Sequence, residues 1–156
     1  AYTVFHFGAN PNTGWSSLVN LQRASDDNYF RDLSSRLAVA TQTFLPSDVL
    51  LTYASGRGGL WNVTGRAQKW QTLQDPLNPV VEPYNRLPQF TGNYLRSQLG
   101  PLDFNAFGEF VAFDTDQSFL PTGRRGIAYP SLSMPLLRPG GYITPKIGYH
   151  YTAYNL

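Results

Sequence analysis

Hydrophobic and polar residues alternate along most of this chain with a period of two. The clearest case runs over residues 60–71, where an extended strand carries an apolar set on one side and a polar set on the other. The apolar set is Trp61, Val63, Gly65 and Ala67, and the polar set is Asn62, Thr64, Arg66 and Gln68. Because successive side chains of a β-strand point to opposite faces, the pattern predicts a strand with one apolar and one polar face.

The same alternation predicts strands along the rest of the chain. Clear patterns lie at residues 15–22, 33–43 and 143–152, and weaker ones at 2–7, 49–54, 88–94, 104–113 and 125–134. Sequences rich in Gly, Pro, Asn and Asp predict turns at 10–14, 25–28, 45–48, 55–59 and 138–141, and a longer loop at 75–83. Helical periodicity, a repeat unit and a domain boundary are all missing from the sequence. We therefore expect one all-β domain over residues 1–156.

Several of these segments are about ten residues long, which is the length that a tilted strand needs to cross a bilayer. Soluble strands are usually about 5–6 residues long. Aromatic residues such as Trp15, Phe44, Trp70 and Tyr142 lie near segment ends, as in the aromatic girdles of membrane barrels. The expected fold is an antiparallel meander of long amphipathic strands, part of a large transmembrane β-barrel. On pattern alone, a large soluble β-sandwich remains an alternative.

The composition fits strands of this kind. Charged residues make up 14% and aromatic residues 15% of the chain, and the net charge is +2. Such a small net charge gives no reason to expect nucleic-acid binding. With no cysteine, this stretch has no disulfide, no cysteine zinc site and no thiol nucleophile. The first residues are already strand-like and follow no signal peptide, so we expect an internal piece of a longer protein.

The residues that could carry chemistry do not form a recognisable active site. His6 and His150 are the only histidines, and no Gly-x-Ser-x-Gly motif accompanies them, so structural or pore-facing roles are expected. Residues 56–59 lack the Lys-Ser/Thr ending of a phosphate loop and predict a hairpin turn. Asp26 and Asp27 do not have the spacing of an EF-hand and are expected in a solvated loop. The prediction is no enzyme, no cofactor and no metal.

The polar side chains of the strands are the functional candidates. An Arg or Lys on the lipid face near the bilayer midplane costs about 2–4 kcal/mol, so mid-strand cations belong in a lumen. They could guide anionic lipid headgroups or contact a plug protein, or they could form salt bridges to acids such as Glu109. The lumen-facing candidates are Arg36, Asn62, Thr64, Arg66, Gln68 and Lys146.

Several ordered motifs are more specific than the alternation. They are Asp26-Asp27-Asn28-Tyr29-Phe30-Arg31-Asp32-Leu33, Gln71-Thr72-Leu73 and Pro83-Tyr84-Asn85-Arg86-Leu87-Pro88-Gln89, followed by Tyr129-Pro130-Ser131-Leu132 and Tyr142-Ile143-Thr144-Pro145-Lys146. In this order they resemble the barrel part of the LPS-assembly protein LptD family. The resemblance covers roughly residues 15–156 and includes no motif of the family's periplasmic N-terminal domain.

The resemblance implies a component of the lipopolysaccharide (LPS) translocon in the cell outer membrane of Gram-negative bacteria, forming part of the barrel wall. It implies LPS, an LptE-like plug lipoprotein and, through the rest of the chain, periplasmic LPS bridge proteins as partners. In this family, weakly paired strands are associated with lateral opening; Pro130, Pro135 and Pro145 are expected simply at bulges or strand ends. The alternative is a small closed β-barrel, in the outer membrane or soluble, that binds or adheres without a transport role.

Overall fold

The computed structural model describes residues 2–27, 43–74 and 79–156, and every regular element among them is a β-strand. No helix in this part of the chain is long and apolar enough to cross a membrane. The strands are β1 (Tyr2–Asn10), β2 (Trp15–Arg23), β3 (Phe44–Ser55), β4 (Leu60–Thr72), β5 (Asn85–Leu99), β6 (Leu102–Asp114), β7 (Gly123–Ser133), β8 (Leu136–Arg138), β9 (Gly141–Ile143), β10 (Lys146–Gly148) and β11 (Tyr151–Asn155).

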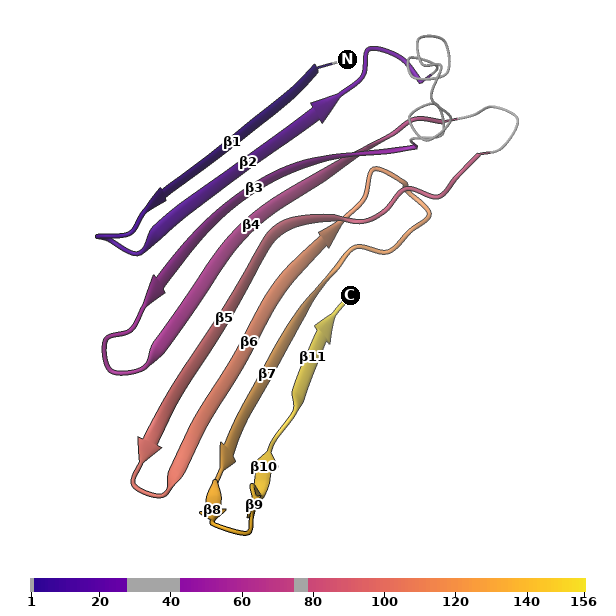
Figure 1. Cartoon of the computed structure of the whole chain (residues 1–156). Helices are drawn as coiled ribbons and strands as arrows, with labels where there is room; N and C mark the ends of the chain where they lie inside the picture. The colour runs from indigo at the N-terminus through magenta and orange to yellow at the C-terminus, as the bar shows by residue number, and fades with distance from the viewer. Residues whose placement is uncertain (1, 28–42, 75–78) are drawn as a thin grey trace.

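One antiparallel sheet holds all of these strands except β8 and β9 (Figure 1). From β1 to β7 each strand pairs with the next one in the sequence, and both β10 and β11 pair with β7. Short turns join β1 to β2, β3 to β4 and β5 to β6 at one end of the sheet, which we call the turn end. The connections from β2 to β3, β4 to β5 and β6 to β7 lie at the opposite end, the loop end, whereas the connection from β7 to β10, which holds β8 and β9, lies at the turn end. The expected all-β antiparallel meander is confirmed.

The sheet does not close on itself within the described residues. In this part of the chain β1 pairs only with β2, and β11 pairs only with β7, so both outer edges lack a neighbour. An isolated small barrel joins its first and last strands and leaves no edge. The alternative of a small closed barrel is therefore wrong for this arrangement.

Apart from residues 33–43, of which only Thr43 is described, each strand region expected from the sequence coincides with or overlaps a strand. The turn expected at 45–48 is wrong, because these residues belong to β3. Pro46 lies one residue beyond the last β2–β3 pair, which joins Leu21 to Ser47. Its missing N–H therefore interrupts no pair with β2, as is usual for proline in a sheet.

A single register runs through the last hairpin although proline divides it into short strands. Ser133 pairs with Lys146 in β10, and the same register resumes where Ala128 pairs with Tyr151 in β11. Between these pairs lies Pro130, whose carbonyl accepts from the Tyr149 N–H at 3.0 Å but which has no N–H to return. Pro130 was expected at a bulge or strand end; it lies inside β7, and the break falls in the partner strand.

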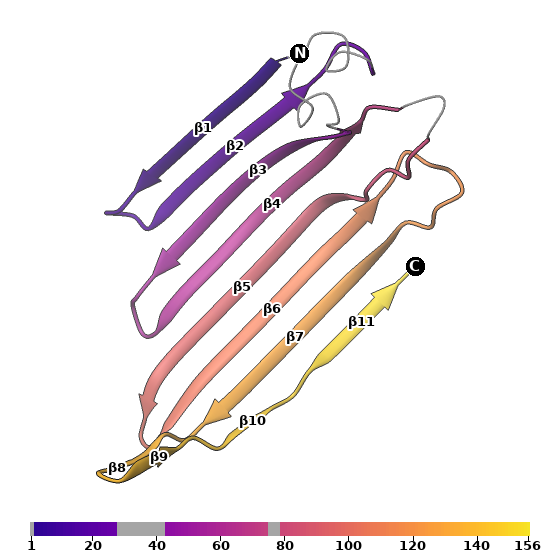
Figure 2. The same cartoon turned by 45° about the vertical axis from the view of Figure 1, so that its right-hand side comes forward.

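The other two prolines separate this hairpin from the two-stranded ribbon of β8 and β9. Pro135 follows β7 and Pro145 precedes β10, so both lie at strand ends as expected. The Met134 N–H donates to the Pro145 carbonyl at 3.0 Å across the gap. Beyond it the ribbon continues past the rest of the sheet and turns out of its plane (Figure 2). The prolines thus allow a long hairpin to bend without losing its register.

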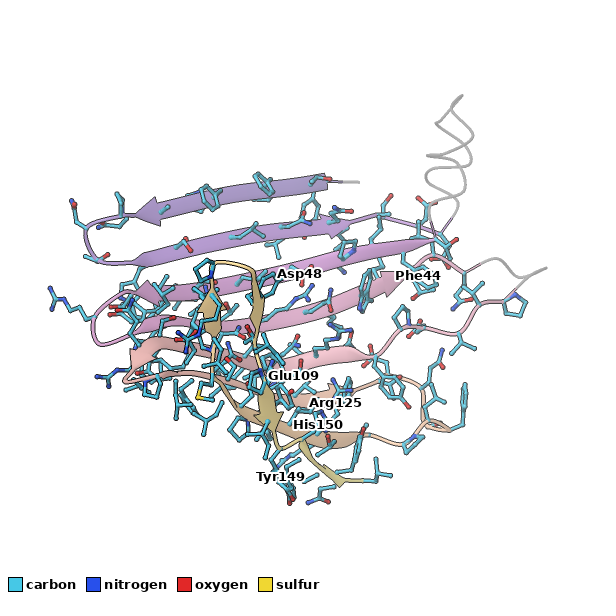
Figure 3. All side chains as sticks on the ribbon, turned by 60° about the horizontal axis from the view of Figure 1, so that its bottom comes forward. Phe44, Asp48, Glu109, Arg125, Tyr149 and His150 are labelled. Atoms are coloured by element: carbon cyan, nitrogen blue, oxygen red, sulfur yellow. The ribbon has the colours of Figure 1, made fainter. Side chains whose placement is uncertain are left out.

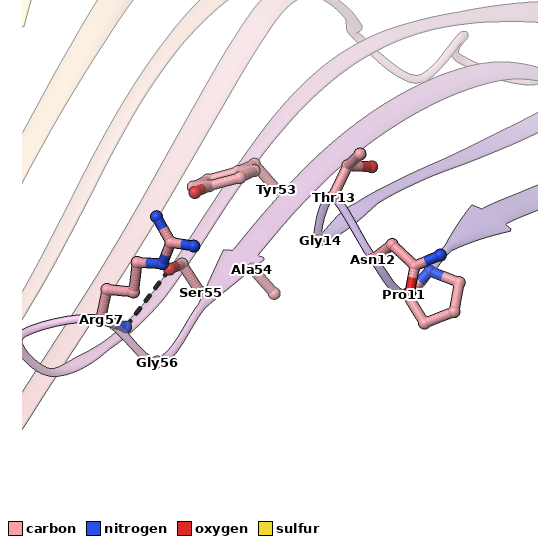
Figure 4. Close-up of a pocket in the computed structure, with 9 residues that line it drawn as sticks. All are labelled: Pro11, Asn12, Thr13, Gly14, Tyr53, Ala54, Ser55, Gly56 and Arg57. Atoms are coloured by element: carbon pink, nitrogen blue, oxygen red, sulfur yellow. Dashed lines mark hydrogen bonds between the residues drawn. The ribbon is translucent and has the colours of Figure 1, made fainter.

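The turns at residues 11–14 and 56–59 lie side by side and enclose a shallow hollow at the turn end (Figure 4). The Ala54 N–H donates to the Gly14 carbonyl at 2.8 Å, which ties the first turn to β3. A side chain at Gly14 would place its Cβ 2.0 Å from the Ala54 oxygen, and the φ of this residue is +74°. Only glycine fits here.

An aromatic row crosses the sheet close to these turns. The ring centroids of Trp15 and Tyr53 are 5.0 Å apart, those of Trp61 and Tyr94 are 4.1 Å apart, and Phe104 lies 5.9 Å beyond Tyr94. The strands β2 to β6 each contribute one or more members. Stacked and tilted contacts of this kind stabilise neighbouring strands beyond their burial.

The β3–β4 turn provides a test of how the aromatic row is anchored. The Tyr94 hydroxyl donates to the Gly58 carbonyl at 2.8 Å. A Cβ at Gly59 would lie 2.4 Å from the Tyr94 ring, whereas a Cβ at Gly58 meets nothing within 4 Å. Both glycines have positive φ, +138° and +69°. Gly58→Ala, at a φ that L residues can adopt, should therefore cost only about 1–2 kcal/mol. Gly59→Ala should cost a further 1–3 kcal/mol, roughly, from the clash with the Tyr94 ring together with a φ that is essentially restricted to glycine.

The measurement is the free energy of unfolding of the two variants in urea, within the full-length protein in lipid. Equal losses in the two variants would show that the Tyr94 ring does not rest on this turn.

Candidate polar face of the sheet

The pairing register separates the side chains into two faces. In β3 and β4, Asp48 lies opposite Gln68 and Thr52 opposite Thr64, whereas Tyr53 lies opposite Val63. We call the first side the polar face and the second the apolar face. The sequence-derived candidates Asn62, Thr64, Arg66 and Gln68 all lie on the polar face. Lys146 lies opposite Ser133, and the register carried across β5, β6 and β7 places it on the same face.

The two faces have the reverse of the burial found in water-soluble proteins. On the polar face, the side chains of Gln68 and Ser131 are only 4% exposed. On the apolar face, Leu51 is 50%, Val63 43% and Phe90 51% exposed. A sheet that curves toward one side crowds the side chains of that side, so this burial indicates curvature toward the polar face. In a soluble protein the apolar set would be the buried one.

Asp48 is the centre of the first polar network. Its Oδ1 accepts from the Arg66 Nε at 2.8 Å, and its Oδ2 accepts from the Gln68 Nε2 at 3.3 Å. Alongside, the hydroxyls of Thr52 and Thr64 lie 3.0 Å apart. The Asp48 carboxylate therefore has a partner on each oxygen, as a carboxylate with little exposure requires.

Glu109 is the centre of the second network, further across the same face (Figure 3). It accepts from the Gln89 Nε2 at 3.1 Å and forms an ion pair with Arg125. The Arg125 guanidinium also lies 5.4 Å above the centre of the Phe113 ring. Since Gln89 lies opposite Arg66 in the register, the two networks adjoin and form one belt of alternating charge from β3 to β7.

A third group, around Tyr129, lies at the β7–β10 side of the polar face. The Lys146 Nζ is 5.5 Å above the centre of the Tyr129 ring, and the His150 ring is 6.0 Å from it. Tyr129 rests on Gly148, where a Cβ would lie 2.8 Å from its hydroxyl. Lys146 forms no ion pair with any described residue. Its charge is held by a ring face and is not neutralised by an acid.

The sequence-derived candidates differ in their surroundings in the structure. Arg36 lies outside the described residues. Arg66 has the salt-bridge environment that was one of the two interpretations, although its partner is Asp48 and the partner of Glu109 is Arg125. Lys146 lies apart from the belt.

The central acid and the second cation of the belt are not among the lumen-facing candidates derived from the sequence. Asp48 was assigned to a turn, and Arg125 lies in a weakly alternating strand. Glu109 was named only as a possible partner. For Asp48 the available signal is its spacing of four residues from Thr52, because an extended strand places two such residues on the same face.

The histidines do not approach each other. His6 lies opposite Val19 in β1, on the apolar face at one edge of the sheet, and His150 lies on the polar face at the other edge. Residues 56–59 form the expected hairpin turn. Among the described residues, no three His, Asp or Glu side chains are grouped so that they could hold a metal ion.

Long antiparallel strands that bury a polar face and expose an apolar one are the construction of a membrane β-barrel wall. A family model described as LptD, LPS transport system D, matches residues 7–156. The chain belongs to this family of LPS-assembly proteins.

Individual relatives carry the same name. The chain is 38% identical to the LPS-assembly protein LptD of Nitrosomonas eutropha over 146 residues, which are 92% of this chain and 20% of that protein. It is 43% identical to that of Azoarcus sp. over 140 residues, 88% of the chain and 17% of the relative. For Acidovorax sp. the identity is 36% over 99% of the chain and 20% of the relative. The chain thus spans about a fifth of the length of these relatives.

The Glu109–Arg125 pair can be tested by a double-mutant cycle. Glu109→Gln removes the charge that holds Arg125, whose side chain is 31% exposed, so the free energy of unfolding should fall by about 1–3 kcal/mol. The double variant Glu109→Gln with Arg125→Gln removes both charges and should lose less than the sum of the single losses. We expect a coupling of about 0.5–3 kcal/mol, measured by urea unfolding in lipid.

A matched pair on the same strands serves as the control. The substitutions Ala112→Ser and Ala128→Ser lie on the apolar face of β6 and β7, four register positions apart, so the two side chains do not touch. Their effects should add to within a few tenths of a kcal/mol. Strict additivity of the Glu109 and Arg125 substitutions would contradict the ion pair.

Proposed function

We propose that this chain is a continuous section, residues 1–156, of the wall of the outer-membrane LPS translocon, through which LPS is inserted into the outer leaflet. The observation that carries the proposal is the reversed burial of the two faces, in a chain that belongs to the LptD family. The exposed apolar face contacts lipid, and the buried polar face lines the lumen.

The dimensions of the apolar face fit a bilayer. In β4 this face begins at Trp61 in the aromatic row and reaches its first charge at Lys69. Eight steps of about 3.3 Å give about 26 Å along the strand. With the usual tilt of 35–45° this is about 19–22 Å in height, close to the apolar band of roughly 25 Å in membrane barrels. The aromatic row then lies at one membrane interface.

The open edges of the sheet support a wall section. In hydrocarbon each unpaired backbone group costs several kcal/mol, so β1 and β11 need further strands beside them. The relatives are about five times longer than this chain and provide room for those strands. In bacterial barrels the short turns face the periplasm, so we place the loop end of the sheet outside the cell.

The polar face then acts as a conduit without covalent chemistry. Asn62 and Thr64 present hydrogen-bonding groups, and Arg66 and Lys146 present positive charge, toward the sugar and phosphate groups of LPS. Gln68, the remaining candidate of this strand, is nearly buried and supports Asp48 beneath them. Arg36 is proposed to join them. An LptE-like plug lipoprotein would occupy the lumen, and periplasmic bridge proteins would supply LPS through the rest of the protein. This role requires no enzyme activity, cofactor or metal.

The membrane position of the two faces is tested by cysteine labelling. Asn62 and Val63 are neighbours in β4 whose side chains lie on opposite faces. In the full-length protein in lipid nanodiscs, Asn62→Cys should react with a small charged thiol reagent at least tenfold faster than Val63→Cys, because charged reagents do not enter hydrocarbon. A Thr13→Cys variant in the exposed β1–β2 turn shows that the reagent is active. Similar rates at Asn62 and Val63 would contradict a membrane wall.

The transport role needs a second experiment. A photo-crosslinking residue at Asn93, exposed on the polar face, should capture newly synthesised LPS in cells. Phe90, which is exposed on the apolar face, is the comparison position for the same photo-crosslinking residue, because there it faces membrane lipid and not the proposed conduit. Capture should fall when the supply of LPS from the periplasm is stopped. If Asn93 captured no LPS in cells that deliver it, the conduit role would be wrong while the membrane position could stand.

A further inference from the structure

Two cations lie on the apolar face at the loop end of the sheet, where a lipid-facing wall would otherwise avoid charge. Arg23 ends β2 opposite Tyr2, and Lys69 lies near the end of β4 opposite Ser47. Both side chains are exposed. They line one hollow of about 530 Å³, together with Tyr2, Ser47, Glu82 and Asp116.

The protein itself does not neutralise these charges strongly. The Lys69 Nζ lies 3.5 Å from the Asp116 Oδ2, but the two side chains are 57% and 67% exposed, and such surface pairs stabilise little. Arg23 forms no ion pair within the part of the chain that the structure describes. The guanidinium of Arg23 and the ammonium of Lys69 therefore have N–H groups left to donate to a ligand in the hollow that the two residues line.

The position of the hollow selects the kind of ligand. In the proposed orientation Arg23 and Lys69 lie at the level of the outer-leaflet headgroups, and their register positions place both on the outer face of the wall. The other interface of the same face has the aromatic row of Trp15, Trp61 and Tyr94. The loop end thus brings two cations to one hollow, whereas the turn end of the same face has the aromatic row with Arg96 beside it.

The mixture of cationic and acidic side chains further restricts which ligands the hollow can bind. Arginine and lysine bind phosphate oxygens through charge-assisted hydrogen bonds. The carboxylates of Glu82 and Asp116 only accept hydrogen bonds, and sugar hydroxyls are suitable donors to them. A phosphatidylglycerol headgroup has hydroxyls only on one short flexible arm, whereas a phosphorylated sugar holds its hydroxyls on a rigid ring beside the phosphate and can reach cations and carboxylates at once.

We propose that Arg23 and Lys69 hold a phosphate of a phosphorylated glycolipid resident in the outer leaflet, with Glu82 and Asp116 receiving hydrogen bonds from its sugar hydroxyls. The site binds lipid that has already been inserted, and it is separate from the conduit on the polar face. The proposal rests on the proposed function for the membrane position of the apolar face.

The test uses the full-length protein in nanodiscs that contain diphosphoryl lipid A as the probe. A photo-crosslinking residue replaces Ser47, at the floor of the hollow. We expect capture of lipid A to fall at least tenfold when Arg23→Gln and Lys69→Gln are combined. Capture should remain within about threefold for the charge-preserving pair Arg23→Lys and Lys69→Arg.

Arg96→Gln is the matched control, since Arg96 lies opposite Phe104 on the same face at the turn end. It should leave capture unchanged. Lipid A without phosphates, and phosphatidylglycerol carrying the same acyl chains, should each be captured at least tenfold less than diphosphoryl lipid A. Equal capture of these probes, or no loss in the Arg23 and Lys69 variant, would overturn the proposal.

Failure of this site is distinguishable from failure of the proposed function. If the cysteine pattern at positions 62 and 63 is that of a membrane wall and capture at position 47 is insensitive to Arg23 and Lys69, only the glycolipid site is wrong. If the cysteine pattern itself fails, the membrane position fails and the site loses its basis as well.

Discussion

The backbone hydrogen bonds between neighbouring strands are the constraint on which the rest of this molecule depends. In hydrocarbon no water can satisfy an exposed N–H or C=O, so a spanning segment must pair every such group. A meander of long antiparallel strands does this with short turns, and the pairing from β1 to β7 is unbroken in order. Once the strands are paired, alternate side chains must face lipid or lumen, and the two faces of the sheet acquire their different compositions.

Burial on the polar face creates a second requirement, because its charged and amide groups have limited access to water. Asp48 and Glu109 are each satisfied by partners from neighbouring strands, which also links those strands. Two atoms of these networks, the Oε1 of Gln89 and the Nε of Arg125, are buried and have no hydrogen-bond partner. In the proposed wall, water from the lumen can complete the network at these two atoms.

In the last hairpin, a proline leaves one backbone hydrogen bond between the paired strands unformed. Pro130 accepts a hydrogen bond from Tyr149 but donates none, so the Tyr149 carbonyl lacks its ladder partner there. On its other side Pro130 lies opposite Ala106, and the β6–β7 register continues through it without a shift. The weakness is therefore confined to the outer strand pair, and β7 stays fixed to the body of the sheet.

Alternation in the sequence predicted the strands and the face of each residue in β4, because a strict period of two admits only one assignment of faces. It could not predict which residues meet across strands, since that depends on register. The Asp48–Arg66 pair therefore could not be predicted from the sequence. In addition, Pro46 made the segment that carries Asp48 look like a turn, although it belongs to a strand. In β1 the pattern misleads in another way, because Phe5 and Phe7 lie on the polar side while His6 shares the apolar side with Val19.

The charge arrangement of the polar face has a consequence for a conduit. A path that moves an anionic lipid must attract its headgroup, yet it must not hold it so firmly that it cannot leave. Arg66 and Arg125 are each paired with a carboxylate, so they offer donors without a large net positive potential. Lys146 is weakened differently, by a ring face that leaves its ammonium available. In the proposed wall, the belt of paired charges therefore gives weak successive contacts to a lipid that must move along it. Stronger phosphate binding is proposed only on the outer side, for lipid that is already inserted and is no longer transported.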